Sequence, residues 1–330
     1  MGKISVHYLC AAASVYEMAC YHPITAYRSN RGRDPVTKKW PLVFKRNQGF
    51  TDLEVKIPCG QCIGCRLERS RQWAVRCVHE SKLYPNNNCF LTLTYNDENL
   101  PRGINTETGE LDAGEPSLNK RDIVLFLKRL RKKYGDGIRF FQCGEYGEQL
   151  RRPHHHVLLF NHVFPDKKYW KTKKGVHLYL SDTLNKLWGL GHCVIGDVNF
   201  ESAAYVARYV TKKITGDPQR VLDHYGGILP EYITMSRKPG IARNFFEEFQ
   251  SDIYPSDQCV LRPGLIARPP KYYDNIYDLT NPESFAKIKK ARRVHAITSA
   301  DNTPERLKDR ELCQLLKAQK LYRKYESGEC

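Results

Sequence analysis

The sequence predicts an α+β fold in which helices pack on a central antiparallel β-sheet. Short runs rich in β-branched and aromatic residues alternate with longer segments whose apolar residues recur at helical spacing. Neighbouring strand-like runs are joined by polar, Gly-containing connections that suit hairpins, and hairpins pair strands antiparallel. We therefore expect an antiparallel sheet with helices covering one face.

The first third of the chain is expected to lead from irregular structure into a helix and a strand. Residues 21–58 are polar and interrupted by Pro and Gly, which predicts irregular structure. A basic helix is expected from Arg66 to Leu83, because Pro85 prevents its continuation. Residues 89–95 are rich in β-formers and predict a strand, and a turn-rich loop should follow at 96–116.

The middle of the chain predicts a second basic helix and a hairpin. Asn119 is a suitable N-cap for this helix and Gly135 a suitable end, with an apolar stripe between them. The runs 138–143 and 154–160 then indicate two strands, joined by polar residues that include Gly. This arrangement predicts a hairpin with a long loop.

The next segment predicts a helix, a strand and a further helix. A short helix is expected at Leu184–Trp188, with Ser181 or Asp182 as its cap. Residues 192–198 indicate a strand. Another helix should begin at Ser202 and end near Gly216.

Three regions are expected along the chain. Residues 1–65 should form an irregular N-terminal segment that contains a cysteine loop, and residues 66–250 the main domain. Residues 251–330 should form a basic C-terminal extension. Within this extension, Pro-rich loops beyond residue 260 should give way to a charged helical tail at 303–326.

The charge of the chain indicates an anionic partner. The 330 residues include 53 Lys and Arg against 36 Asp and Glu, a formal net charge of +17. Nucleic acid and an acidic membrane surface both fit this charge. No apolar run approaches the roughly 20 residues of a membrane-spanning helix, so an integral membrane protein is not expected. Most of the 12 cysteines are scattered without a disulfide framework, which favours a reducing compartment and a cytosolic protein.

Three consecutive histidines are the most specific chemical feature. Alternate side chains of a strand share a face, so His154 and His156 should point one way and His155 the other. Two imidazoles on one face can bind one metal ion, with a third ligand from a neighbouring strand. Glu145 is the first choice for that ligand and Glu148 the second. Such a set could hold Mn, Mg, Zn or Fe, whereas without a third ligand the pattern is only a histidine-rich strand end.

The segment 203–214 predicts a helix with two different faces. Its apolar face consists of Ala203, Val206, Ala207, Val210 and Ile214. Tyr205, Tyr209 and Lys212 fall within roughly 60° of one another on the opposite side. Since the apolar stripe is complete without the tyrosines, both phenols should face something other than the core. A pair of surface tyrosines is the simpler alternative.

The histidine strand and the tyrosine helix together supply two halves of one reaction. A tyrosine has a pKa near ~10 and is a weak nucleophile, and a cation such as Lys212 or Lys213 would favour its phenolate. A divalent ion on a phosphate would neutralise charge and polarise the P–O bond. On a chain of this charge, the two halves point to attack of a tyrosine on a DNA phosphodiester.

These motifs, in this order, resemble those of HUH endonucleases, in which two histidines flank one residue of a strand and tyrosines lie on a later helix. More narrowly, the chain is similar to the rolling-circle replication initiators of small single-stranded-DNA phages of the gokushovirus type. The matching stretches are Pro58–Arg66, Trp73–Arg76, Phe90–Tyr95, Gly144–Gly147, Arg152–Phe160 and Tyr205–Lys213. The resemblance therefore spans about residues 58–213 and does not extend to residues 260–330.

The resemblance implies a role for each site residue. It implies a divalent ion (Mg²⁺ or Mn²⁺) with His154, His156 and Glu145 as its ligands. It implies that Tyr205 and Tyr209 are nucleophiles and that Lys212 or Lys213 assists at the phosphate. His155 stands where an apolar or aromatic residue is expected, and it is an alternative ligand if the strand is twisted.

The resemblance also implies a reaction and its partners. One tyrosine would nick single-stranded or melted DNA at a phage origin, becoming joined to the 5′-phosphate and leaving a free 3′-OH to prime synthesis. The second would cut the regenerated origin, so that the displaced strand is closed into a circle. The host helicase and polymerase would be partners, and the host cytoplasm the location.

A second candidate metal site lies in a cysteine-rich loop. Three cysteines occur there at every third position: Cys59, Cys62 and Cys65. They supply three thiolates, one fewer than a tetrahedral structural zinc site needs. Cys20 is the first candidate for the fourth ligand, with Cys77 and His79 as rivals, and a zinc ion held by Cys20 would fasten the N-terminal segment to the domain. An iron–sulfur cluster also uses thiolates, and three free thiols are the alternative without a metal.

Two function classes fit these features. The first is a metal-dependent DNA endonuclease (a nickase) that also joins strands by tyrosine transesterification, a chemistry that HUH transposases and plasmid relaxases share. The second is a non-catalytic, zinc-stabilised single-stranded nucleic-acid-binding protein whose cations hold phosphates and whose tyrosines stack on bases. Only the first predicts a covalent protein–DNA product that is lost when Tyr205 and Tyr209 are both changed to Phe.

Overall fold

The chain forms two compact units. A computed structural model describes residues 20–35, 40–104, 107–109, 111–147, 150–173, 175–212, 218–226 and 228–326. Of these, the large unit contains residues 69–291, and the small unit contains residues 20–68 and 292–326. Residues 251–291, which the sequence assigned to a C-terminal extension, thus lie in the same unit as the central sheet.

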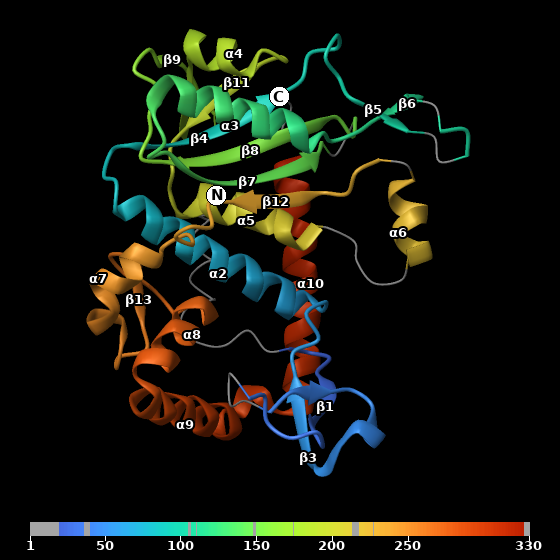
Figure 1. Cartoon of the computed structure of the whole chain (residues 1–330), viewed down its shortest axis with the longest axis vertical. Helices are drawn as coiled ribbons and strands as arrows, with labels where there is room; N and C mark the ends of the chain where they lie inside the picture. The colour runs from blue at the N-terminus through green and yellow to red at the C-terminus, as the bar shows by residue number, and fades with distance from the viewer. Residues whose placement is uncertain are drawn as a thin grey trace, which may run out of the picture. The chain divides into compact units, whose positions relative to one another are not determined.

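The large unit contains most of the secondary structure (Figure 1). Its strands are β4 (Asn88–Thr94), β5 (Arg102–Ile104), β6 (Leu111–Pro116), β7 (Arg139–Tyr146), β8 (Pro153–Phe160), β9 (Lys168–Lys173), β10 (Val176–Leu180), β11 (Cys193–Gly196), β12 (Tyr232–Met235), β13 (Cys259–Arg262) and β14 (Leu265–Ala267). Its helices are α3 (Lys120–Tyr134), α4 (Asp182–Trp188), α5 (Phe200–Lys212), α6 (Pro218–Tyr225), α7 (Arg243–Ile253) and α8 (Lys271–Thr280). Two helices, α2 (Ile63–Lys82) and α9 (Pro282–Thr298), contain residues of both units.

The small unit contains a second, smaller sheet. Its elements are β1 (Ile24–Ser29), β2 (Leu42–Val43), the 3-10 helix η1 (Arg46–Gln48), β3 (Gly49–Ile57), the 3-10 helix η2 (Ala300–Asn302) and α10 (Pro304–Glu326). The three strands pair antiparallel in the order β2-β1-β3.

Seven strands of the large unit form one antiparallel sheet. Their order is β12-β7-β8-β4-β11-β10-β9, and every neighbouring pair is antiparallel. The expected α+β class with a central antiparallel sheet is therefore confirmed. The hairpin expected at 138–160 is β7–β8, and β4 pairs with the other edge of β8. The histidine strand β8 therefore lies between β7 and β4 in the sheet.

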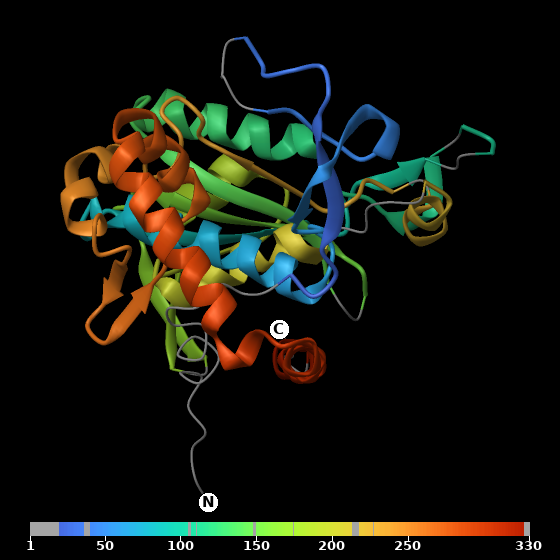
Figure 2. The same cartoon turned by 90° about the horizontal axis from the view of Figure 1, so that it is seen from below.

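Helices cover both faces of this sheet, so the expectation of one covered face is wrong (Figures 1 and 2). On one face, Leu91 and Val157 pack against Phe126 of α3 and its neighbours. On the other face, Phe141 and Leu158 belong to the core that α2, α5, α7 and α8 cover. Because β7 and β8 are buried on both faces, their apolar residues do not alternate with polar ones, and the sequence pattern cannot show how many faces are covered.

Local sequence signals set the ends of two helices. The side chain of Asn119 accepts a hydrogen bond from the backbone N–H two residues later, and Gly135 ends α3 with a φ of +93°. Ser181 Oγ accepts from Leu184 N at 3.0 Å, so the serine rather than Asp182 caps α4. Both helices were expected from these residues.

Two segments that were expected to be irregular contain strands. Residues 21–58 hold β1, β2 and β3, and the loop 96–116 holds the β5–β6 pair. The residues of β3 are mostly exposed, so no apolar alternation marks this strand in the sequence. The stretch beyond about residue 260 was expected to consist of Pro-rich loops before the helical tail, but β13 and β14 form a hairpin there and α8 and α9 precede α10.

Candidate functional site

The pairing of β7 with β8 brings two histidines and a glutamate together. Glu145 lies directly opposite His154, and His156 lies two residues further along the same face of β8. The Nε2 atoms of His154 and His156 lie 2.5 Å and 2.6 Å from Oε1 of Glu145. One carboxylate oxygen is therefore shared by two imidazoles, on the face of the sheet that α5 covers.

The second nitrogen of each imidazole also has a partner. His154 Nδ1 lies 3.1 Å from the backbone carbonyl of Arg152, which can only accept, so Nδ1 carries the proton. His156 Nδ1 lies 3.1 Å from Thr92 Oγ1, and Phe90 stacks on its ring. Partners at Nδ1 turn Nε2 toward Glu145, as second-layer groups do for histidine ligands of metals.

The carboxylate of Glu145 is buried and ionised. Burial by itself raises the pKa of a carboxyl group, but the positive charges of His154 and His156 and their hydrogen bonds bring the pKa of Glu145 down to about 2. Its Oε2 atom is buried with no hydrogen-bond partner among the described residues. A buried carboxylate oxygen without a partner is costly. This donor set therefore fits a divalent ion, although two imidazoles and one carboxylate do not fix its identity.

His155 lies on the opposite face and takes part in a different network. Its Nε2 is 3.0 Å from Tyr95 Oη, which donates to Asp122, and its Nδ1 is 3.5 Å from Tyr232 Oη. Complete burial, with the charges of the two neighbouring histidines, lowers the pKa of His155 to about 3, so its ring is neutral. His155 is therefore not an alternative ligand; strand alternation points it into the other core.

Helix α5 carries a tyrosine to the edge of this site. Ala203, Val206 and Ala207 are buried against the sheet, which confirms this part of the predicted apolar face. Tyr205 is partly buried against the same core, and its Oη lies 3.4 Å from Glu145 Oε1 and 3.5 Å from His156 Nε2. The phenol of Tyr205 can therefore contact an ion or phosphate bound at Glu145 and His156.

Other predicted site residues fall partly or wholly outside the described residues. Tyr209 and Lys212 belong to α5, with Tyr209 one turn after Tyr205, but their side chains are outside the described part of the chain. Lys213 and Glu148 lie wholly outside it.

Two side chains next to the site were not singled out from the sequence. Thr92 of β4 pairs in register with His156 and bonds to its Nδ1. In the sequence, Thr92 lies between Leu91 and Leu93, so on a strand it points to the face opposite to these leucines. This alternation could have indicated its position near the site. Arg208 has its guanidinium carbon 5.7 Å from the centre of the Tyr205 ring, where a cation favours the phenolate. Its position three residues after Tyr205 was visible in the sequence, but arginine is common on helix surfaces.

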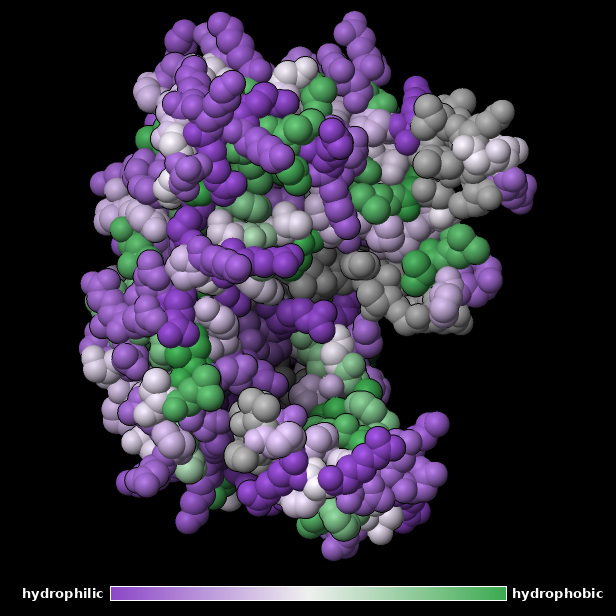
Figure 3. Space-filling model, viewed as in Figure 1, coloured by the Kyte–Doolittle hydropathy of each residue, from purple (hydrophilic) through white to green (hydrophobic). Residues whose placement is uncertain are grey.

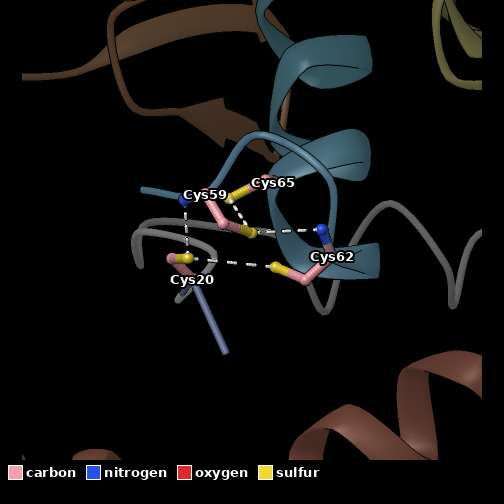
Figure 4. A group of neighbouring side chains, drawn as sticks. All are labelled: Cys20, Cys59, Cys62 and Cys65. Carbon is pink, nitrogen blue, oxygen red and sulfur yellow. Dashed lines mark hydrogen bonds between the residues drawn. The ribbon is translucent and has the colours of Figure 1, made fainter. Parts of the chain in front are cut away.

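A second cluster of metal-binding side chains lies in the small unit (Figure 4). Cys20 precedes β1, and Cys59, Cys62 and Cys65 come from the loop and first turn that begin α2. Their four Sγ atoms lie within 4.8 Å of one another. The two rival ligands lie elsewhere: Cys77 is buried in the core of the large unit, and His79 stacks on Phe245.

The surface around α3 is hydrophilic and basic. Figure 3 shows mostly hydrophilic side chains over the part of the large unit that α3 covers. Its exposed cations are Lys120, Arg121, Lys128, Arg129, Lys132 and Lys133. Arg129 already donates to the backbone carbonyls of Leu187 and Trp188, so part of this charge holds α4 in place. Within the described chain, no helix combines the length and apolar character needed to cross a bilayer.

Sequence comparison assigns the chain to a class of phage proteins. The family model for the replication-associated protein ORF2/G2P matches residues 88–214, which include β4, β7, β8 and all of α5. The chain belongs to the family of phage replication-associated proteins, which confirms the resemblance drawn from its motifs.

Individual relatives cover most of the chain. It is 32% identical over 269 residues to the replication-associated protein ORF2 of Spiroplasma virus 4, covering 78% of this chain and 79% of that protein. It is 34% identical over 285 residues to the replication-associated protein VP4 of Bdellovibrio phage phiMH2K, covering 82% of each. A shorter match, 30% over 174 residues, covers 48% of this chain and 38% of the replication-associated protein ORF4 of Chlamydia phage 1. No solved structure matches.

Proposed function

We propose that the chain initiates rolling-circle replication by nicking single-stranded phage origin DNA and later rejoining the strand, acting in the cytoplasm of the host. The observation that carries this proposal is the placement of Tyr205 Oη, 3.4 Å from Glu145 Oε1 and 3.5 Å from His156 Nε2. At this distance, a nucleophile and an ion held by these ligands can act on the same phosphate.

In this proposal, Tyr205 carries out a transesterification. Its Oη forms a bond to phosphorus and the P–O3′ bond breaks. The phenol proton is lost to solvent and the leaving 3′ oxygen gains one, so a 5′-phosphotyrosine and a free 3′-OH result. The phosphodiester bond is exchanged rather than hydrolysed, and the reverse reaction can therefore seal a strand.

The residues around Tyr205 have separate tasks. Glu145, His154 and His156 hold a Mg²⁺ or Mn²⁺ ion, which supplies Lewis-acid polarisation of the phosphate when bound. The guanidinium of Arg208 favours the phenolate. Tyr209, one turn later on α5, is the second nucleophile, which cuts the regenerated origin, and Lys212 or Lys213 assists at the phosphate. The host helicase and polymerase use the product and its 3′-OH.

The test is a denaturing gel with labelled single-stranded oligonucleotides that tile the phage genome. With Mn²⁺ or Mg²⁺ we expect a protein–DNA adduct that survives denaturation, and with EDTA none. Tyr205→Phe should lose most of the adduct and the double variant with Tyr209→Phe all of it. Tyr169→Phe, an exposed tyrosine of β9, is the matched control and should react like the wild type.

The ligand variants separate binding from chemistry. His154→Ala and His156→Ala should abolish cleavage while the oligonucleotide still binds, because the bulk of the basic surface is unchanged. DNA that is cut without an adduct would contradict the tyrosine assignment and favour an activated water. DNA that binds and stays intact with every metal would favour a non-catalytic nucleic-acid-binding protein.

A further inference from the structure

We propose that Cys20, Cys59, Cys62 and Cys65 bind one structural Zn²⁺ as four thiolates, and that this ion organises the small unit. The replication chemistry does not need this site, and its four side chains lie in a different unit from Tyr205.

The spacing of the sulfur atoms fits a single tetrahedral ion. A Zn–S bond is about 2.3 Å, so two thiolates of a tetrahedral zinc site lie about 3.8 Å apart. The Sγ atoms of Cys59 and Cys65 are 4.0 Å apart, and so are those of Cys62 and Cys20 (Figure 4). All four Sγ atoms surround one point, with no separation above 4.8 Å.

The same spacing argues against the other uses of clustered cysteines. A disulfide requires about 2.05 Å between sulfur atoms, and here the four are arranged around a centre rather than in two bonded pairs. An iron–sulfur cluster places several iron atoms between its thiolate ligands, which needs a wider ring of sulfur atoms. A single metal ion is the species that fits this space.

Backbone donors are aimed at the sulfur atoms. The N–H of Cys59 donates to Cys20 Sγ at 3.2 Å, and those of Gln61 and Cys62 donate to Cys59 Sγ at 3.4 and 3.3 Å. Hydrogen bonds from N–H groups stabilise the charged form of a thiol. Cys62 and Cys65 also lie at the N-terminus of α2, where the helix dipole favours negative charge and no acidic side chain is present in the first turn.

The small unit lacks the hydrophobic core that would otherwise hold it together. Among its described residues, only Ala26, Ser29 and Gly64 are buried, and the hydrophobic clusters of the described chain all lie in the large unit. Its sheet leaves large apolar side chains exposed, with Leu42 at 43% and Ile24 at 42%. Small folds without a sufficient core commonly depend on a metal or disulfides. Zinc would join the chain before β1 to the start of α2.

One further contact continues this connection within the small unit. His22, two residues after Cys20, has its Nε2 atom 2.9 Å from Glu311 Oε1 of α10. An ion that holds Cys20 in place therefore also restricts His22, the residue that contacts α10.

The two candidate metal sites should select different ions. Soft thiolates favour zinc, whereas a site with a carboxylate and room for phosphate oxygens accepts Mg²⁺ or Mn²⁺. The two sites can therefore be loaded and emptied independently, which makes the proposal testable without any measurement of activity.

The first experiment measures zinc bound to the full chain by mass spectrometry of metals. The chain carries His154→Ala and His156→Ala, so that the other site cannot contribute. We expect one zinc per chain, and close to none when Cys62→Ser or Cys59→Ser is added. Cys313→Ser, an exposed cysteine of α10 in the same unit, is the matched control and should keep its zinc.

Replacement of zinc by Co²⁺ identifies the ligands. Four thiolates around Co²⁺ give intense thiolate-to-metal charge-transfer absorption and the visible bands of a tetrahedral ion. This spectrum should be present in the control and absent with Cys62→Ser. Any of four results would overturn the proposal. They are zinc-free protein with four reactive thiols, disulfides detected by mass, iron in place of zinc, and the same zinc content in all variants.

A second measurement tests the structural role of the ion. It uses the wild-type chain, so its outcome does not depend on whether a cysteine variant folds. Zinc is removed from the wild-type chain by a strong chelator, and amide hydrogen exchange is followed. Exchange should accelerate at least tenfold in β1 and β3 and return to its original rate when zinc is restored, while β7 and β8 stay protected. Unchanged exchange in β1 and β3 would show that the ion does not organise this unit.

Discussion

Thr92→Val is the substitution that best tests how the histidine site is prepared for an ion. For His156 to bind a metal through Nε2, its Nδ1 must carry the proton and donate to Thr92 Oγ1, 3.1 Å away. Valine has nearly the same shape but no acceptor, so this N–H loses its hydrogen bond to residue 92. His156 is then less well held in the form that offers the Nε2 lone pair to an ion.

The expected loss of Mn²⁺ affinity follows from that lost hydrogen bond. Removing one partner of a buried hydrogen bond costs about 1–3 kcal/mol, and about 1.4 kcal/mol is a factor of ten in affinity. We therefore expect Mn²⁺ to bind about 10- to 100-fold more weakly to Thr92→Val, as is usual when the outer partner of a histidine ligand is removed. Calorimetric titration with Mn²⁺, without DNA, measures this directly.

Thr94→Val is the matched control for this measurement. Thr94 lies on the same face of β4 and pairs in register with His154, but its hydroxyl donates to the backbone carbonyl of His192 at 2.9 Å. Its removal should leave the Mn²⁺ affinity unchanged. Equal affinity in Thr92→Val and wild type, or an equal loss in both variants, would refute the reasoning.

Three further predictions concern packing, pH and salt. A β-carbon at Gly144 would lie 2.7 Å from Tyr232 Cε1 and 3.0 Å from Leu118 Cδ2, so Gly144→Ala should lower the free energy of unfolding in urea by about 1–3 kcal/mol; an unchanged midpoint would contradict this. Burial and the charge of Lys82 lower the pKa of His79 to about 3. The unfolded histidine takes up its proton near pH ~6.5, so this residue makes stability fall as pH falls from about 6.5 toward 3, by about 1.4 kcal/mol per pH unit. His79→Phe should remove that part of the slope, and an identical slope would argue against a neutral buried ring. Single-stranded DNA affinity should fall steeply with salt, by about 0.7 in log–log slope per phosphate contacted, and a flat dependence in a binding titration would exclude phosphate contacts as its main source.

The centre of the fold could be predicted because its signals are local. Asn119 marks the start of α3 through its capping side chain and Gly135 marks the end through its backbone freedom. The strands β7 and β8 each contain a short apolar run and are joined by a turn-rich segment. The position of Glu145 opposite His154 followed from the hairpin, although only the structure fixes the register that places both imidazoles on one carboxylate oxygen.

The remaining parts could not be predicted because their causes are not local. The strand β3 is exposed along most of its length, so no apolar period marks it. Cys20 was the first candidate for the fourth ligand, but it reaches the cysteine loop only after the chain has folded, so spacing alone could not exclude Cys77. The role of Thr92 depends on pairing between β4 and β8, which are separated in sequence by β5, β6, α3 and β7.

The hydrogen-bond network behind the histidine strand has an evolutionary consequence. Tyr95, Asp122, His155 and Tyr232 each supply a polar group whose partner is another member, and all of them except the partly exposed Asp122 are buried. Replacing one member alone leaves a buried group unpaired, whereas replacing several together can restore a dry, apolar packing. We therefore expect these four positions to change together among relatives. The identity of residue 155, between the two metal-facing histidines, should follow that of its packing partners and not the reaction that the protein catalyses.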